Sequence, residues 1–315
     1  MSSVLYTPPQ GPDCGSLIHI ETNDVLTRTY RRFIREAALL RAFPNYNLQY
    51  GMGAFFQRRM HPFRLIKKGA ICVQVGCTEW MLDFGVSQPL LMAGLAGASG
   101  RVIAVDPDDR NKRALLDYLN RHGVSHVDFV QDALFDEVKE AEFTFYHDRT
   151  SSNVITEVAD VSVWNSSHVD RPKFTKKIML NTLDRVCVDK GITPDFVNIS
   201  INDAEFGVIK GMDEILGKRK TMVAWLIGGG RSWWADSLDH FLKRNYNVIV
   251  GNAPYSRRGP SKNGKVSFLT SKEIYQEYYA IAVPKEMHLP HHSEFLVESL
   301  ETIGLSLDFT VCKAT

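Results

Sequence analysis

Short apolar runs, each ended by a turn residue, recur along the middle of the chain. Residues 71–75 form one such run, which ends at Gly76, and residues 102–105 form a second, which ends at Asp106. Between them, residues 86–96 are apolar enough for a helix packed on a sheet. Strand, glycine turn, helix, strand and acidic residue is the sequence form of a nucleotide-binding βαβ unit. Any buried βαβ unit that uses Asp106 in a turn has the same pattern, so that simpler interpretation stays open.

The same pattern predicts further elements toward the C-terminus. The additional predicted strands are 127–130, 143–146, 177–180, 196–201, 222–227, 246–250 and 278–283. The additional predicted helices are about 109–120, one that starts at 183, 202–217 and 238–245. Because helices alternate with strands, the fold class is α/β, a doubly wound, mostly parallel, Rossmann-like sheet of seven strands. Strands 143–146 and 177–180 are expected to be an added pair, and the last hairpin is expected to supply an antiparallel strand.

The two ends of the chain differ from this middle part. Residues 1–68 are predicted to be an irregular segment followed by a basic amphipathic helix over about 22–42, an N-terminal helical extension of the fold. This segment carries ten Lys and Arg against four acids, which suits either a solvated helix face or a docking surface. Residues 69–287 are predicted to be the Rossmann-like domain, and 288–315 a tail.

The glycine pattern limits which nucleotide could bind. A dinucleotide fingerprint needs G-x-G-x-x-G, but Gly76 is followed by no glycine until Gly85, and no P-loop motif occurs. A single-glycine turn and a strand-end acid suit a ligand that has a ribose and no phosphate, such as S-adenosylmethionine. Asp106 would then hold the ribose hydroxyls. Asp132, which follows the third strand, would face the adenine edge or merely cap the next turn.

Composition and charge limit the partners, metal sites and cellular compartment that we expect for this chain. The chain has 315 residues, 44% hydrophobic and 23% charged, and a formal net charge of +1, so nucleic acid is an improbable partner on electrostatic grounds. The five cysteines show no spacing typical of zinc sites and fit free thiols in a reducing compartment, so no metal site is expected. Without a signal peptide or membrane-spanning run, the expectation is a cytoplasmic protein with no membrane partner. A homodimer stays open.

Two stretches carry candidate proton-handling groups. His147 begins a dense polar segment that runs to Asn153, which suits either a substrate pocket or a polar hairpin loop. Asp203 starts a predicted helix and is expected to be either a general base or, more simply, the helix cap. His147 and Asp203 are the predicted catalytic residues, because a general base would assist transfer to a neutral hydroxyl.

Four motifs in order resemble the FkbM family of S-adenosylmethionine-dependent methyltransferases over roughly residues 69–285. They are Val-Gln-Val-Gly at 73–76, Val-Ile-Ala-Val-Asp-Pro at 102–107, Asn-Thr-Leu-Asp at 181–184, and Pro-Asp-Phe-Val-Asn-Ile-Ser-Ile-Asn-Asp-Ala-Glu at 194–205 followed by Lys-Gly at 210–211. The resemblance implies a class I methyltransferase fold, S-adenosyl-L-methionine as cofactor, and methylation of a hydroxyl on a small molecule, sugar or secondary metabolite. The cofactor-binding residues predicted from pattern and resemblance together are Gln74, Gly76, Cys77, Asp106, Pro107, Asp132 and Ala133.

The sequence also departs from that family. Gln74 stands where the family has an acid, and Asn198, Ser200, Asn202 and Asp203 stand where it has Lys, Asp, Glu and Gly. The sequence therefore leaves two function classes open. One is an O-methyltransferase that acts on a small-molecule hydroxyl. The other is a binding or scaffold protein that keeps the fold and has lost the chemistry.

Overall fold

The computed structural model describes residues 63–79, 87–159, 171–227, 233–252, 278–287 and 309–312. The predicted basic helix at 22–42 and most of the predicted tail lie outside these residues. The predicted domain boundaries at 68 and 287 stay predictions.

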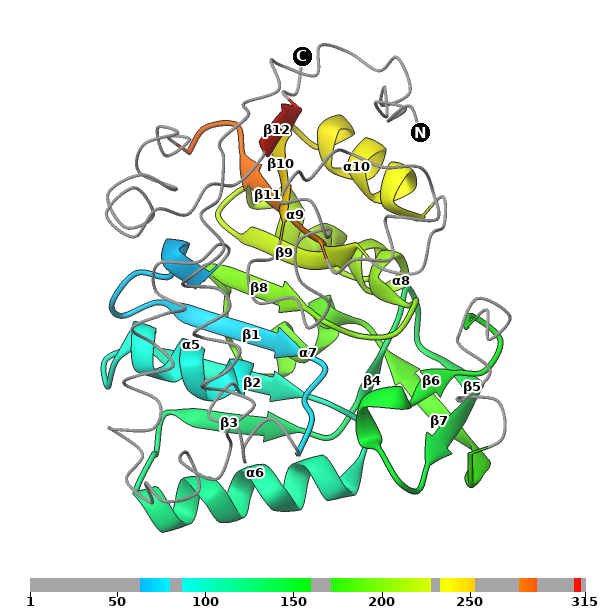
Figure 1. Cartoon of the computed structure of the whole chain (residues 1–315). Helices are drawn as coiled ribbons and strands as arrows, with labels where there is room; N and C mark the ends of the chain where they lie inside the picture. Colours follow the sequence, from blue (N-terminus) through cyan, green and yellow to red (C-terminus); the bar gives the residue numbers. More distant parts are fainter. Residues whose placement is uncertain are drawn as a thin grey trace, which may run out of the picture.

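The main sheet has eight strands in the order β12-β10-β11-β9-β8-β1-β2-β3 (Figure 1). They are β1 (Ile71–Val75), β2 (Arg101–Val105), β3 (Val127–Val130), β8 (Phe196–Ile199), β9 (Met222–Ile227), β10 (Tyr246–Asn252), β11 (Tyr278–Pro284) and β12 (Phe309–Cys312). All seven predicted strands are confirmed, and β12, in the segment predicted to be a tail, adds an eighth. The pairs from β3 to β9 are parallel, whereas β11 is antiparallel to β9 and β10. The predicted antiparallel strand is therefore confirmed.

The chain changes direction across the sheet beside β1. It lays β1, β2 and β3 side by side in one direction and then returns to place β8 on the other side of β1. In register, Gln74 of β1 lies between Ala104 of β2 and Asn198 of β8. Open α/β sheets bind ligands outside the carboxyl ends of the strands at such a switch point. The carboxyl ends of β1, β2 and β8 are therefore the place to look for a site.

The helical elements are η1 (Phe63–Leu65), α5 (Gln88–Ala96), α6 (Asp109–His122), α7 (Leu183–Asp189), α8 (Glu205–Lys210), α9 (Asp213–Gly217) and α10 (Trp233–Lys243). They cover both faces of the sheet, and alternate strand residues point to opposite faces. Helices α5 and α6 pack on the face that carries Cys72, Val102 and Phe196, whereas α7 to α10 pack on the face that carries Val73, Ile103 and Val197. The doubly wound α/β prediction is confirmed. Within the described part of the chain, no helix combines the length and apolarity needed to cross a membrane.

The single helix predicted over 202–217 is wrong, because the chain forms two short helices there, α8 and α9. Gly211 lies between them, and a Cβ built on it would be 2.1 Å from the carbonyl oxygen of Phe135. Five apolar residues of this stretch nevertheless lie in the core, namely Val208, Ile209, Met212, Ile215 and Leu216.

A second sheet is inserted between β3 and α7, in the order β4-β7-β5-β6. Its elements are β4 (Ala133–Leu134), β5 (Lys139–Tyr146), η2 (Thr150–Ser152), β6 (Val154–Ile155) and β7 (Lys173–Asn181). The predicted added pair is confirmed as the antiparallel strands β5 and β7, both longer than predicted. Figure 1 shows this sheet on the right, beside the arrowheads of β1, β2 and β3. Phe143 and Leu180 of the insert share an apolar cluster with Ala204, which follows β8, so the insert packs at the carboxyl end of the main sheet.

Candidate functional site

The glycine turn after β1 has a left-handed backbone. Gly76 has φ +84°, and its N–H donates to the carbonyl oxygen of Val105 at the end of β2 (2.9 Å). A Cβ on Gly76 would lie 2.2 Å from the carbonyl oxygen of Ser200 and 2.8 Å from Cγ2 of Ile201. Only glycine tolerates both the backbone angle and this approach. The chain that comes close to Gly76 is thus the segment after β8, which the sequence did not indicate.

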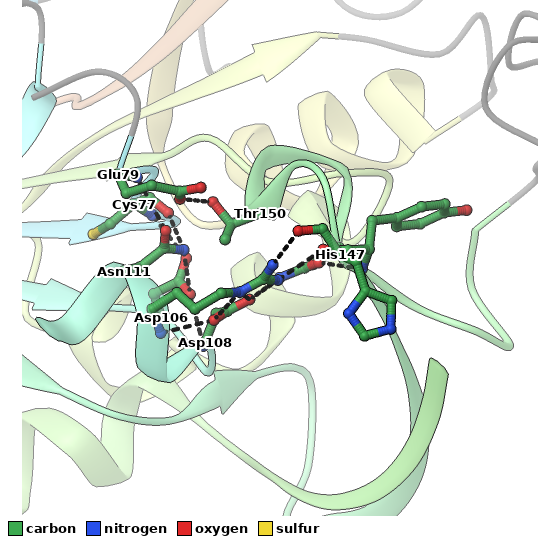
Figure 2. A network of polar contacts seen from close by, with 10 residues as sticks. Cys77, Glu79, Asp106, Asp108, Asn111, His147 and Thr150 are labelled. Atoms are coloured by element: carbon green, nitrogen blue, oxygen red, sulfur yellow. Dashed lines mark hydrogen bonds and ion pairs between the residues drawn. The ribbon is translucent and has the colours of Figure 1, made fainter. Parts of the chain in front are cut away.

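Asp106 lies at the tip of β2, 8% exposed, and its carboxylate holds the glycine turn (Figure 2). One oxygen, Oδ2, accepts from the backbone N–H of Cys77 at 2.9 Å. The other, Oδ1, accepts from the backbone N–H of Asp108 and from Nδ2 of Asn111, each at 2.9 Å. Since a carboxylate has about four acceptor positions, the contacts among the described residues leave one position on Oδ2 for a further donor. That position can accept from one ribose hydroxyl, whereas the prediction that Asp106 takes both hydroxyls needs Asn111 to move.

Among the described residues, none of the hydrogen-bond partners of the Asp106 carboxylate is a cation. Burial raises the pKa of Asp106 to about 7, although the bonds from Cys77, Asn111 and Asp108 act in the opposite direction. Burial, together with the Asp106 carboxylate, also raises the pKa of the Cys77 thiol well above its ordinary value. Cys77 therefore contributes its backbone N–H and carbonyl to the site, and its thiol stays neutral.

Below the glycine turn, Gln74 and Asn198 form a buried amide pair. Gln74 Nε2 donates to the carbonyl oxygens of Val75 and Gly76 at 3.0 and 2.8 Å, which fixes the orientation of its amide. Its Oε1 must then accept from Nδ2 of Asn198, at 2.8 Å. Both side chains are fully buried. These are two of the positions at which the sequence departs from the FkbM pattern, and the structure joins them as one neutral pair.

The inserted sheet reaches this edge through Asp108 and Arg110. Arg110 donates from Nε and Nη2 to the Asp108 carboxylate, from Nη2 to the carbonyl of Tyr146 and from Nη1 to the carbonyl of His147, the last two at 2.8 Å. Asp108 Oδ2 also accepts from Nδ2 of Asn153 at 2.7 Å. Burial alone would raise the pKa of Asp108, but the bonds from Arg110 and Asn153 hold it below its ordinary value. Asp108 is therefore a charged anchor for the insert.

Asn202, Asp203 and Glu205 lie close together in the segment that follows β8. Asn202 Nδ2 donates to the carbonyl oxygens of Ser151 and Asn153, both at 2.9 Å. Asp203 has φ +63° and lies directly before Ala204, which occupies the N-cap position of α8. Burial, reinforced by the charge on Asp203, raises the pKa of Glu205 well above its ordinary value.

The remaining predicted site residues lie at the rim. The His147 side chain is exposed and packs beside Phe174, with 5.1 Å between ring centroids. Figure 2 shows its imidazole turned away from the network around Asp106, which His147 joins only through its carbonyl. Asp132 accepts from Nδ2 of Asn181 at 3.0 Å, which ties the end of β3 to the end of β7. Ala133 is buried in β4, and Pro107 forms the half-buried turn between Asp106 and Asp108.

Comparison with solved structures gives methyltransferases at low similarity. The methyltransferase FkbM from Methylobacillus flagellatus KT is 11% identical, with a TM-score of 0.40, over 72% of this chain and 49% of its own. The chain thus spans about half the length of that protein. An S-adenosylmethionine-dependent O-methyltransferase from Thermotoga maritima (11%, 0.38) matches over 76% of this chain and 66% of its own. A putative rRNA methylase from Clostridium thermocellum (11%, 0.37) matches over 75% and 96%. No protein-family model matches the sequence, and no curated protein does.

Three residues of the candidate site were not predicted as site residues from the sequence. Asn111 and Arg110 lie in the first turn of α6, where they read as ordinary polar helix residues. Glu205 could have been found, because it belongs to the Ala-Glu pair that the chain shares with the FkbM pattern. For metals, the described residues contain no group of three or more His, Cys, Asp or Glu that could hold an ion.

Proposed function

We propose that the chain is an S-adenosylmethionine-dependent methyltransferase that acts on a hydroxyl of a small molecule, sugar or secondary metabolite. The observation that carries this proposal is the pairing of Gly76 and Asp106 at the carboxyl ends of adjacent parallel strands, beside the switch point of the sheet. The turn has one glycine and no glycine-rich seat for a pyrophosphate, which favours a nucleoside ligand without phosphates. The acceptor class comes from the resemblance to the FkbM family.

The residues at this edge fit such a cofactor. Asp106 keeps one acceptor position for a ribose hydroxyl, and Asp132 with Ala133 would border the adenine. Thr78 Oγ1 and Asn198 Oδ1 are buried, and neither has a hydrogen-bond partner within the described parts of the chain. A buried unpaired polar atom costs roughly 1–3 kcal/mol. A ligand that brings ammonium and hydroxyl donors to this edge would satisfy such acceptors, and S-adenosylmethionine carries both.

Bound there, the cofactor would supply a methyl group activated by a sulfonium. The chain would contribute positioning of the acceptor, exclusion of water by the inserted sheet, and a base for the hydroxyl proton. We propose Glu205 as the base, because burial raises the pKa of its carboxyl well above the ordinary value and a carboxylate of higher pKa is a stronger base. Asp203 lies two residues away, and its negative charge also raises the pKa of Glu205. His147 could act only if its ring turned toward the site.

Calorimetry with S-adenosylhomocysteine tests the proposal directly. We expect binding to the purified chain, no competition from NADH, and transfer of a labelled methyl group from S-adenosylmethionine to a small molecule detected by mass spectrometry. Absence of S-adenosylhomocysteine binding at millimolar concentration would overturn the proposal.

Cofactor affinity should depend on pH through Asp106. A ribose hydroxyl donates to the charged carboxylate of Asp106. Because the pKa of Asp106 is about 7, this carboxyl is mostly protonated in the free protein at pH 6. Affinity should therefore rise with pH, by about tenfold between pH 6 and pH 8, as follows from one proton lost around pH 7. Calorimetry across this range measures it, with Asp106→Asn as the control that binds weakly and without this slope. A flat profile in the parent would place the ribose elsewhere.

One set of contacts favours the second candidate, a binding protein without catalysis. Asn202 and Asp108 stand at strand ends, where they could meet substrate, yet both hold the inserted loop. If binding is the function, S-adenosylhomocysteine should bind but no methyl transfer should occur with any acceptor, even in a single turnover with excess protein. Methyl transfer at any measurable rate would show that the chain is an enzyme and would reject the binding-protein candidate.

A further inference from the structure

The turn at residues 106–108 carries two carboxylates that serve different partners. Asp106 binds the glycine turn after β1, whereas Asp108 binds Arg110 and Asn153 and so faces the inserted sheet. A hydrogen bond from the Asp108 N–H to Asp106 Oδ1, at 2.9 Å, links the two. A movement of the Asp106 carboxylate is therefore transmitted to Asp108 through one hydrogen bond and one peptide turn.

Arg110 turns this link into a bridge between the sheets. Its guanidinium binds the carboxylate of Asp108 in a forked arrangement, with Nη2 to Oδ2 at 2.6 Å, and also binds two consecutive carbonyls at the end of β5. Asp108 is almost fully buried and the Arg110 side chain is one-third exposed, so solvent weakens the pair less than it would at the surface. Lysine keeps the charge but lacks the planar fork, so it cannot make these contacts together.

The loop of residues 147–153 begins at the His147 carbonyl that Arg110 binds, and it is fixed from two other strand ends as well. Asn202, after β8, binds the carbonyls of Ser151 and Asn153. Glu79, after β1, accepts a hydrogen bond from the hydroxyl of Thr150, as Figure 2 shows. The loop 147–153 is thus held from the carboxyl ends of β1, β2 and β8 together.

We propose that Arg110 is a positioning residue that couples cofactor binding at Asp106 to docking of the inserted loop 147–153. This inference rests on the proposed function. A ribose hydroxyl on Asp106 fixes the turn 106–108, and the fixed turn holds Asp108 and Arg110 in place to bind the loop. Because coupling between two sites is reciprocal, a firmly docked loop also strengthens cofactor binding. The loop is then held more firmly against the carboxyl edge of the main sheet when the cofactor is present.

The test combines calorimetry with hydrogen exchange of the backbone amides in residues 146–155. In the parent, S-adenosylhomocysteine should slow exchange of this segment about tenfold. In Arg110→Lys that slowing should disappear, and affinity for S-adenosylhomocysteine should fall about five- to tenfold, the lower range of measured couplings. Arg113→Lys is the matched control, because Arg113 lies on the same helix in an exposed pair with Asp109 and does not touch the loop. It should behave as the parent.

Asn202→Ala provides a second variant, because it frees the loop from the β8 side without touching Asp106 or Arg110. It should also weaken S-adenosylhomocysteine binding and reduce the ligand-dependent slowing. Faster exchange in both variants, combined with unchanged affinity and unchanged ligand-dependent slowing, would show that these residues only hold the insert, and would overturn the coupling. Failure of the parent to bind S-adenosylhomocysteine would instead overturn the proposed function and this inference with it.

Discussion

Asp106→Ala should weaken binding of S-adenosylhomocysteine by about 2–3 kcal/mol, or roughly 30- to 150-fold, as measured by calorimetry. The direct loss is one charge-assisted hydrogen bond from the ribose to the open position of Oδ2. An indirect loss adds to it, because the backbone N–H of Cys77 and Nδ2 of Asn111 lose the acceptor that fixes the glycine turn. The turn would then have to be ordered by the ligand.

The matched control for this change is Asp128→Ala. Asp128 is an acid on the neighbouring strand β3, but its carboxylate forms a half-exposed pair with Arg101, at the opposite end of β2 from Asp106. Its removal should leave affinity unchanged, since exposed ion pairs contribute little. If Asp106→Ala binds as tightly as Asp128→Ala, Asp106 serves only the fold, and the ribose must lie elsewhere.

The sequence predicted most of the elements because their signals are local. β1 and β2 are five-residue apolar strands, each followed directly by a turn residue. Helix α6 begins after Asp108, whose side chain accepts from the N–H of Arg110, and ends at Gly123 in a left-handed conformation. Such caps are encoded within a few residues of the helix end, so pattern alone locates them.

The site was harder to predict because its contacts join residues that are distant in sequence. Asn202 and Ser151 are 51 positions apart, and no periodicity indicates that an amide at one will bind the carbonyl of the other. The orientation of His147 was hard to predict for a related reason. Tyr146, the last residue of β5, is buried, whereas His147, just beyond the strand, is exposed. Only the position of the insert decides which of them faces the site.

Several departures from the FkbM pattern remove charged side chains that could serve catalysis, and the structure shows what the residues at these positions bind instead. Gln74 and Asn198 replace two charged positions, yet they pair with each other across β1 and β8. Such a neutral pair avoids the desolvation of two buried ions. Asn202 stands where the pattern has an acid, and it makes two hydrogen bonds to the insert. These side chains therefore stabilise the scaffold around the glycine turn.

Gly76→Ala should destabilise the chain by about 2–5 kcal/mol, because two costs combine at this position. An alanine at φ +84° loses roughly 1–2 kcal/mol from the left-handed backbone alone. Its Cβ would also meet the backbone oxygen of Ser200 at 2.2 Å, so β1 and the segment after β8 must separate. Overpacking of this kind typically costs a further 1–3 kcal/mol. Urea denaturation of the variant and the parent measures the difference.

Gly123→Ala separates the two costs. Gly123 has φ +64° at the end of α6, and a Cβ there would meet no atom within 4 Å, so its variant pays for the backbone angle alone. A larger loss for Gly76→Ala than for Gly123→Ala therefore measures the close approach of β1 to the segment after β8. Equal losses would mean that this approach relaxes freely. In that case a fall in S-adenosylhomocysteine affinity confined to Gly76→Ala would show that the glycine is needed where the ligand, and not Ser200, meets the turn.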